Sequence, residues 1–153
     1  MPRDFDILLT GFPEPDRRAF CQVGRSKDFT LHQTLVHEEE VGSAMFTLEL
    51  GEVSIWMKGV KLAVLKSGGV FGASSLIEPH RRTATVLAED YVRATIFRRE
   101  DVLQFFKTRS PRLFQQFFLN SFRAHLSLVR RCNDVIVQLD GQLRKEASRP
   151  RVP

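Results

Sequence analysis

The sequence has little cysteine, and its cysteines are isolated. Cys21 and Cys132 are the two present, and neither belongs to a C-x-x-C pair or stands near histidines at zinc-binding spacing. A disulfide framework or a structural zinc site needs several such ligands close together. The sequence therefore predicts reduced thiols, no bound metal and a cytoplasmic protein.

Long apolar runs are also missing. No segment approaches the roughly 18 uncharged residues that a membrane-spanning helix needs, and no basic leader opens the chain. The sequence has no G-x-S-x-G elbow, no G-x-x-x-x-G-K-[ST] loop and no H-E-x-x-H pair. We therefore expect a soluble protein with no catalytic residues, no membrane partner and no cofactor.

Histidines and acids occur together once, where His32 and His37 precede three glutamates at 38–40. Metal-dependent β-barrel enzymes of the cupin type use two close histidines and a carboxylate. A five-residue step, however, places the two rings on opposite faces of a straight strand, so this segment does not predict a metal centre.

The apolar content is enough for one core. Of the 153 residues 42% are hydrophobic and 27% are charged, as in ordinary globular proteins. A chain of this length buries roughly two-thirds of the surface that it exposes when unfolded, so a single domain accounts for it. We place the domain at residues 1–143. Residues 144–153 are basic, contain proline and lack apolar periodicity, which predicts a disordered tail.

The net charge of +5 favours an anionic partner. The basic residues lie in adjacent pairs at 81–82, 98–99 and 130–131, without interleaved aromatic residues for base stacking. A DNA-reading helix-turn-helix would need further helices, which residues 144–153 cannot build. The sequence therefore predicts no DNA binding.

The middle of the chain has the composition of short β-strands. Between residues 29 and 97, runs rich in Val, Ile, Thr and Phe are separated by glycines. We predict strands at residues 44–50, 52–58, 61–65, 83–88 and 92–97, with a hairpin turn at Lys58, Gly59 and Val60. Strands this short and evenly spaced favour a closed roll.

Helices flank this region. Residues 13–23 begin with prolines and acids and end before Gly24, and Glu100 with Asp101 opens another short helix. Ser110 and Pro111 are typical of the N-cap and first position of a longer helix, which we expect to fray at Gly141. The predicted fold class is α+β, an antiparallel, jelly-roll-like β-roll with a short N-terminal and a long C-terminal helix.

The long helix carries two apolar stripes. The first, which we call the heptad stripe, repeats in steps of four and three and predicts a dimer through this helix; it comprises Phe118, Phe122, His125, Val129, Cys132, Ile136, Leu139 and Leu143. The second lies on a neighbouring face and is expected to pack on the roll; it comprises Phe114, Phe117, Leu128 and Val135. The alternative is a helix that lies only on its own domain.

A candidate anion site lies in the segment GVFGASSLIEPHRRTATV at residues 69–86. Gly72 lets the backbone approach an anion, and the turn after it can aim amide groups at a phosphate. Arg82 offers a planar fork of donors, and the hydroxyl of Thr83 adds another. Arg82 is the strongest candidate, Arg81 is the fallback, and Ala84 is small enough for a ligand to lie against it.

This segment resembles the phosphate-binding cassette of cyclic nucleotide-binding domains, and we call residues 69–86 the cassette. In that family Phe-Gly-Glu opens a helical turn, and Arg-Ser/Thr/Ala-Ala opens the next strand ten residues later. The resemblance extends from the leading helix to the long one. It implies a regulatory module without an output domain that binds cAMP, cGMP or another small phosphate. The ligand-binding residues that it implies are Gly72, Ala73, Ser74, Arg82, Thr83 and Ala84.

One residue departs from the family's pattern. Ala73 stands where the resemblance implies a glutamate that accepts a hydrogen bond from the ribose, and loss of such a bond weakens binding about ten- to hundredfold. Glu78 or Ser74 are possible substitutes. From the same resemblance, Ser127, Arg131 and Asn133 are candidates to cap the base. The alternative interpretation is a domain that has lost its ligand and serves as a dimerisation or protein-interaction platform.

Overall fold

The structure is a computed structural model that describes residues 4–149, apart from the side chains of residues 127, 128 and 131. Five helices and ten strands are formed in this part of the chain. The helices are α1 (Asp4–Leu8), α2 (Glu14–Cys21), α3 (Ser74–Ile77), α4 (Arg99–Lys107) and α5 (Pro111–Ala147). The strands are β1 (Arg25–Phe29), β2 (Thr34–Val36), β3 (Val41–Gly42), β4 (Ala44–Leu50), β5 (Val53–Met57), β6 (Val60–Leu65), β7 (Val70–Phe71), β8 (His80–Arg81), β9 (Thr85–Ala88) and β10 (Val92–Arg98).

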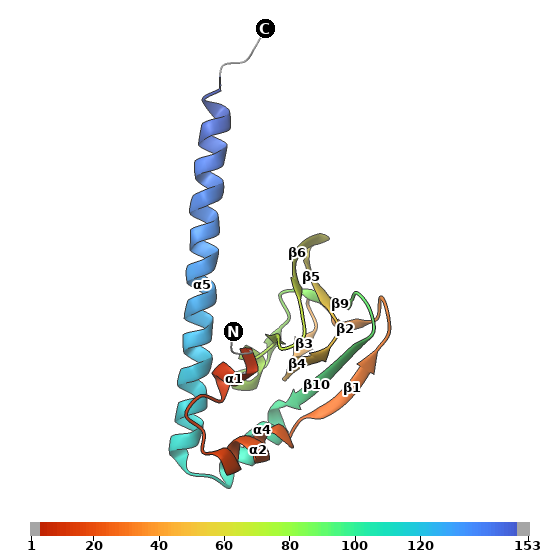
Figure 1. The fold of residues 1–153 in the computed structure, drawn as a ribbon, viewed down its shortest axis with the longest axis vertical. Coiled ribbons are helices and arrows are strands. Elements are labelled where there is room, and N and C mark those ends of the chain that lie inside the picture. Colours follow the sequence, from red (N-terminus) through yellow and green to blue (C-terminus); the bar gives the residue numbers. More distant parts are fainter. Residues whose placement is uncertain (1–3, 150–153) are drawn as a thin grey trace.

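The strands form an antiparallel roll. One sheet has the order β1-β10-β4-β7, a second has the order β2-β9-β5-β6, and β3 pairs with β8. Figure 1 shows the two larger sheets facing each other, with helices at one end and side of the roll. Their inner faces share an apolar cluster that includes Phe29, Phe46 and Val53. The predicted α+β fold class is confirmed.

The five predicted strands are all present, with small differences at their ends. The segment at 44–50 matches β4, and the predicted turn forms with positive φ at Lys58 (49°) and Gly59 (77°). The strand predicted at 83–88 is shorter, because β9 begins at Thr85 and residues 83 and 84 form a bend. The bend directly follows Arg82.

A second core joins the helices to the roll. Phe20 of α2 is fully buried at its centre and stacks on Phe97 of β10, with ring centroids 5.3 Å apart. Phe105 and Phe106 of α4 and Phe117 of α5 also contact the Phe20 ring. Aromatic contacts thus fix where α5 leaves the roll.

Helix α5 begins as predicted, since the Ser110 side chain accepts a hydrogen bond from the Arg112 amide. It does not fray at Gly141 but continues to Ala147, which corrects the tail boundary expected at residue 144. One flexible residue is too small a penalty to stop a 37-residue helix. Residues 150–153 lie outside the described part of the chain.

Figure 1 shows that the C-terminal half of α5 projects beyond the rest of the molecule. At its base, the Asn120 amide donates to the Leu8 and Thr10 carbonyls, at 2.9 and 2.8 Å. Of the second apolar stripe, Phe117 is buried, Phe114 and Val135 are exposed, and the Leu128 side chain is outside the described residues. No helix in the described part of the chain is long and apolar enough to span a membrane.

Candidate phosphate site

Arg82 is the buried polar centre of the cassette. The residue follows β8 in the chain and precedes β9, and it is only 8% exposed. One terminal nitrogen, Nη1, donates to Ser75 Oγ at 2.9 Å, and the other, Nη2, donates to the Ala44 carbonyl at 2.7 Å. The guanidinium carbon is 5.9 Å from the centre of the Phe46 ring. The guanidinium is therefore held in one orientation by groups from β4 and α3.

Two glycines make room for this guanidinium. A Cβ atom on Gly42 would lie 1.9 Å from Arg82 Nε, and one on Gly72 would lie 2.5 Å from Nη1. Gly72 also has a φ of +77°, a conformation that side chains rarely adopt. The structure thus gives both glycines a specific role, namely close approach of backbone to the Arg82 side chain.

Arg82 has no carboxylate partner among the described residues. No ion pair to it is formed, and burial is the sole cause that lowers its pKa from the usual arginine value. A buried cation without a counter-charge is costly unless other groups compensate it. Two of its five N–H donors are taken by Ser75 and Ala44, which leaves donors for a further acceptor.

The other candidate residues differ in whether they contact Arg82. Gly72 contacts Arg82, whereas Thr83 is exposed and Ala84 is half-buried in the bend that follows. Ser74 does not face Arg82, because its hydroxyl lies 2.8 Å from His80 Nε2. Ala73 packs against the helical core. The structure therefore brings Gly72 and Arg82 together and turns Ser74 and Ala73 elsewhere.

Sequence reasoning missed two groups that hold Arg82. Ser75 is fully buried, and the Ala44 carbonyl lies 38 positions away in the chain. The sequence weakly indicated Ser75, since it is a small polar residue in a predicted anion-binding turn. It did not indicate the Ala44 carbonyl, because every residue has a carbonyl group and only the fold determines which one Arg82 contacts.

The sequence predicts that successive amides after Gly72 face an anion. The amide of Ser75 donates to the Gly72 carbonyl and that of Leu76 donates to the Ala73 carbonyl, each at 3.1 Å. These two amides are used inside the turn. The amides of Ala73 and Ser74 donate to no backbone carbonyl in the described part of the chain, and their role at an anion stays a prediction.

Of the remaining candidates, those whose side chains are described form no hydrogen bond with Arg82. Arg81 is exposed and donates to the Glu39 carbonyl at 3.3 Å, and Glu78 is also exposed. Asn133 is exposed on α5, while the Ser127 and Arg131 side chains lie outside the described residues. Within the described part of the chain, no three histidine, cysteine or acidic side chains are grouped so that they could hold a metal ion.

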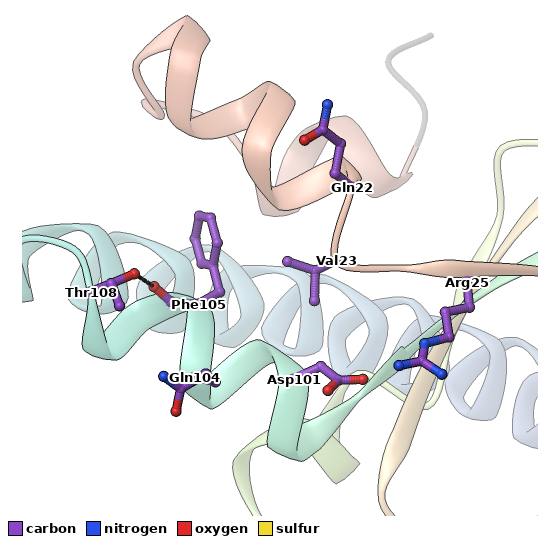
Figure 2. A pocket seen from close by; sticks show the side chains of 7 residues that line it. All are labelled: Gln22, Val23, Arg25, Asp101, Gln104, Phe105 and Thr108. Atoms are coloured by element: carbon purple, nitrogen blue, oxygen red, sulfur yellow. Dashed lines mark hydrogen bonds between the residues drawn. The ribbon is translucent and has the colours of Figure 1, made fainter.

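An open hollow of about 420 Å³ lies between the end of α2 and helix α4. Figure 2 shows Phe105 of α4 next to Val23, with Asp101 and Gln104 also on α4 and Thr108 directly after it. None of the cassette residues lines it. This hollow therefore belongs to a different part of the molecule from Arg82.

The comparisons with known proteins show the family and the fold. The family model described as cyclic nucleotide-binding domain matches residues 26–109, and the chain belongs to this family. A cyclic nucleotide-binding domain from Methylobacillus flagellatus KT superposes with a TM-score of 0.76 at 20% identity, over 87% of this chain and 80% of that one.

Two further solved structures share the fold. The N-terminal domain of a transcriptional regulator from Streptomyces coelicolor A3(2) has a TM-score of 0.71 at 21% identity, over 88% of this chain and 96% of that one. The catabolite activator protein of Thermus thermophilus has a TM-score of 0.70 at 20% identity, over 92% of this chain and 65% of that one. A comparison with curated protein sequences found no match.

Proposed function

We propose that this chain is a regulatory binding module whose ligand is a cyclic nucleotide, with the cyclic phosphate bound by Arg82. The observation that supports the proposal most strongly is the buried guanidinium without a carboxylate partner in the described residues. A phosphate would supply the missing counter-charge through charge-assisted hydrogen bonds. We also propose that the chain binds its ligand without catalysing a reaction, and that it does so in the cytoplasm.

The arrangement around Arg82 favours a compact anion. Ser75 and Ala44 hold the guanidinium plane in place, so little side-chain entropy is lost when a ligand arrives. Gly42 and Gly72 let the backbone lie directly against the guanidinium, where a Cβ atom would overlap it. The exposed Thr83 lies next in the chain and can add a hydroxyl donor to the phosphate.

We propose that the signal passes to α5 through α3 and α4. Helix α3, which carries Ser75, packs against α4, and α4 packs against α5. A ligand that shifts the Arg82 side chain also changes its hydrogen bond to Ser75, because Arg82 donates to the Ser75 hydroxyl. If α5 has two positions, the ligand shifts the population towards the position that it binds better.

A homodimer through α5 is part of this proposal. The heptad stripe is exposed from Val129 to the end, with Val129, Ile136, Leu139 and Leu143 each more than half exposed. A second copy would cover these side chains in a coiled-coil seam. Sedimentation at tens of micromolar should give twice the 17.6 kDa chain mass, and a monomer would contradict the dimer.

The ligand proposal is tested by calorimetric titration of the full chain with cAMP and cGMP. We expect micromolar binding of at least one nucleotide, which Arg82→Ala abolishes and Arg82→Lys weakens, because lysine lacks the planar fork. Arg81→Ala is the matched control, since it removes the same charge from the exposed neighbouring side chain. Equal losses in the two alanine variants would indicate non-specific attraction.

One observation favours the second candidate, a ligand-free interaction platform. Two Arg82 donors already have partners within the protein, and Ala73 provides no carboxylate for a ribose. In that case Arg82 would be a structural residue that ties α3 to β4. Absence of heat with both nucleotides, combined with loss of stability in Arg82→Ala, is the result that this alternative predicts.

A further inference from the structure

The hollow between the end of α2 and helix α4 has one positive and one negative side chain in its wall. Arg25 is the first residue of β1, and Asp101 lies in the first turn of α4. Figure 2 shows both side chains at the end of the hollow where β1 begins. Within the described part of the chain, neither of them forms an ion pair, so the hollow offers a ligand two opposite charges.

The other polar groups at the opposite end of the hollow already have partners. Arg109 donates to Asp16 at 3.0 Å, and its guanidinium carbon lies 4.5 Å from the centre of the Phe105 ring. The Thr108 hydroxyl donates to the Phe105 carbonyl at 2.9 Å and accepts a hydrogen bond from Arg109 at 2.8 Å. These contacts hold the end of α4 in place and leave the two unpaired charges for an incoming molecule.

Apolar side chains form the floor of the hollow. Phe105 is 8% exposed and belongs to the helical core, and Val23 is half-buried and packs against the same core. The exposed Gln22 and Gln104 add amide groups at the rim. A volume of about 420 Å³ lies in the range of small-molecule sites, which combine apolar walls with a few polar groups.

The two charges narrow the class of ligand. A carboxylate matches the planar fork of donors on Arg25, and an ammonium group matches the carboxylate of Asp101. A simple anion would be repelled by Asp101, and a simple cation would be repelled by Arg25. An α-amino acid carries both groups on one carbon atom, so it can satisfy both residues while its own side chain extends over the apolar floor.

We propose that this hollow binds a free α-amino acid with an apolar side chain. The carboxylate binds Arg25, the ammonium group binds Asp101, and the side chain packs on Val23 and Phe105. Because α4 packs against α5, an occupant that joins the end of α2 to α4 fixes the base of the long helix. The site uses neither the cassette nor the heptad stripe, so it stands or falls independently of the proposed function.

Leucine and two of its derivatives are matched probes for the two charges. Leucinamide lacks the carboxylate and N-acetylleucine lacks the ammonium group, whereas the apolar side chain is the same in all three. In two-dimensional NMR titrations of the isotope-labelled full chain, leucine should cause saturable shifts at Gln22, Val23, Asp101 and Gln104. Each derivative should bind about tenfold more weakly, because it loses one charge-assisted hydrogen-bonded group. Equal affinities of the three compounds, or shifts confined to other residues, would overturn the proposal.

Two variants assign each charge of the ligand to one residue. Arg25→Gln should weaken leucine about tenfold and abolish the preference for leucine over leucinamide. Asp101→Asn should likewise abolish the preference for leucine over N-acetylleucine. A preference that persists in its variant would show that the residue does not recognise that group.

Lys27→Gln and Glu100→Gln are the matched controls. They remove the same charges from exposed residues of β1 and α4 that do not line the hollow, so leucine affinity should stay unchanged. Losses as large as those in the two site variants would indicate non-specific attraction and contradict the proposed site. Unchanged amide spectra of the free variants establish that each one folds.

Discussion

At the scale of single residues, the site depends on what surrounds one arginine. Arg82 is buried, and its neighbours are two glycines, a serine hydroxyl and a backbone carbonyl rather than an acid. Burial accordingly lowers the pKa of Arg82, although no side chain of this type loses its proton at ordinary pH. Arg82 therefore keeps its positive charge at ordinary pH.

Gly42 provides the sharpest residue-scale prediction. In Gly42→Ala the added methyl would overlap the guanidinium, so Arg82 must move and its bonds to Ser75 and Ala44 are lost. We expect the free energy of unfolding to fall by about 1–3 kcal/mol, as for other overpacked sites. Urea titration measures this change. The neighbouring exposed Ser43→Ala is the control, and equal stability of the two variants would contradict the packing.

The sequence indicated Arg82 and Gly72 because a motif of fixed spacing contains both. It could not indicate Gly42 or Ala44, since they reach Arg82 only after β3 pairs with β8 and β4 enters the roll. It also placed Ser74 at the ligand, whereas a hydrogen bond to His80 turns that side chain away. Local chemistry was thus predictable, but contacts between distant segments required the fold.

At the scale of elements, the sheet that carries β10 is supported at its edge by an ion pair. Asp28 of β1 accepts two hydrogen bonds from Arg93 of β10, at 2.8 and 3.2 Å. The pair joins residues that face each other in the strand register. The hydrogen bonds that Arg93 donates have the largest effect and lower the pKa of the Asp28 carboxyl, and Tyr91 lowers it further.

Asp28→Asn should therefore have a pH-dependent effect. A carboxyl with a lower pKa in the folded state stabilises the fold above its unfolded pKa, about 3.9, and loses that effect as pH falls through the folded value. The wild type should unfold at a higher temperature than the variant at pH 7, and the difference should shrink towards pH 3. Melting curves at both pH values measure it. A difference that grows on acidification would contradict the assignment.

Helix α5 shows why element boundaries are harder to predict than element types. Its start was predictable because Ser110 and Pro111 act locally. Its end was not, because Gly141 is only one weak residue within a long helix, and residues 144–147 contain the good helix formers Arg, Lys, Glu and Ala. The basic residues Arg144 and Lys145 also suit the negative end of the helix dipole.

Gly141→Ala should strengthen this end of α5. A Cβ atom there would meet nothing within 4 Å, and alanine is favoured over glycine in a helix by about 0.5–1 kcal/mol. We expect slower amide hydrogen exchange after residue 135 and a small gain in helical circular dichroism. Faster exchange in the variant would contradict this prediction, because it would mean that the helix needs glycine at residue 141.

At the scale of the whole molecule, two apolar clusters stabilise different parts of the fold. One fills the β-roll, and the other, centred on Phe20, attaches α1, α2, α4 and α5 to the roll. The composition predicted a single core of adequate size but did not reveal this division. The cassette lies between the two clusters, since Leu76 belongs to the helical one and Phe71 packs on the other. In the proposed function, this position is what would connect a change at Arg82 to the helices.

Phe20→Ala should destabilise the whole molecule. The ring is fully buried among six other phenylalanines, so its removal leaves a cavity that costs about 3–5 kcal/mol. Chemical unfolding measures the loss. Phe122→Ala removes the same ring from a position that is 54% exposed and should have a small effect. Comparable losses in both variants would contradict the central place of Phe20.

The most direct measurement is a crystal structure of the full chain grown with saturating cAMP. The account predicts that a non-bridging phosphate oxygen lies about 3 Å from the Arg82 guanidinium, the distance of a charge-assisted hydrogen bond. Crystals in which Arg82 binds only Ser75 and Ala44, with the nucleotide absent or bound elsewhere, would contradict it.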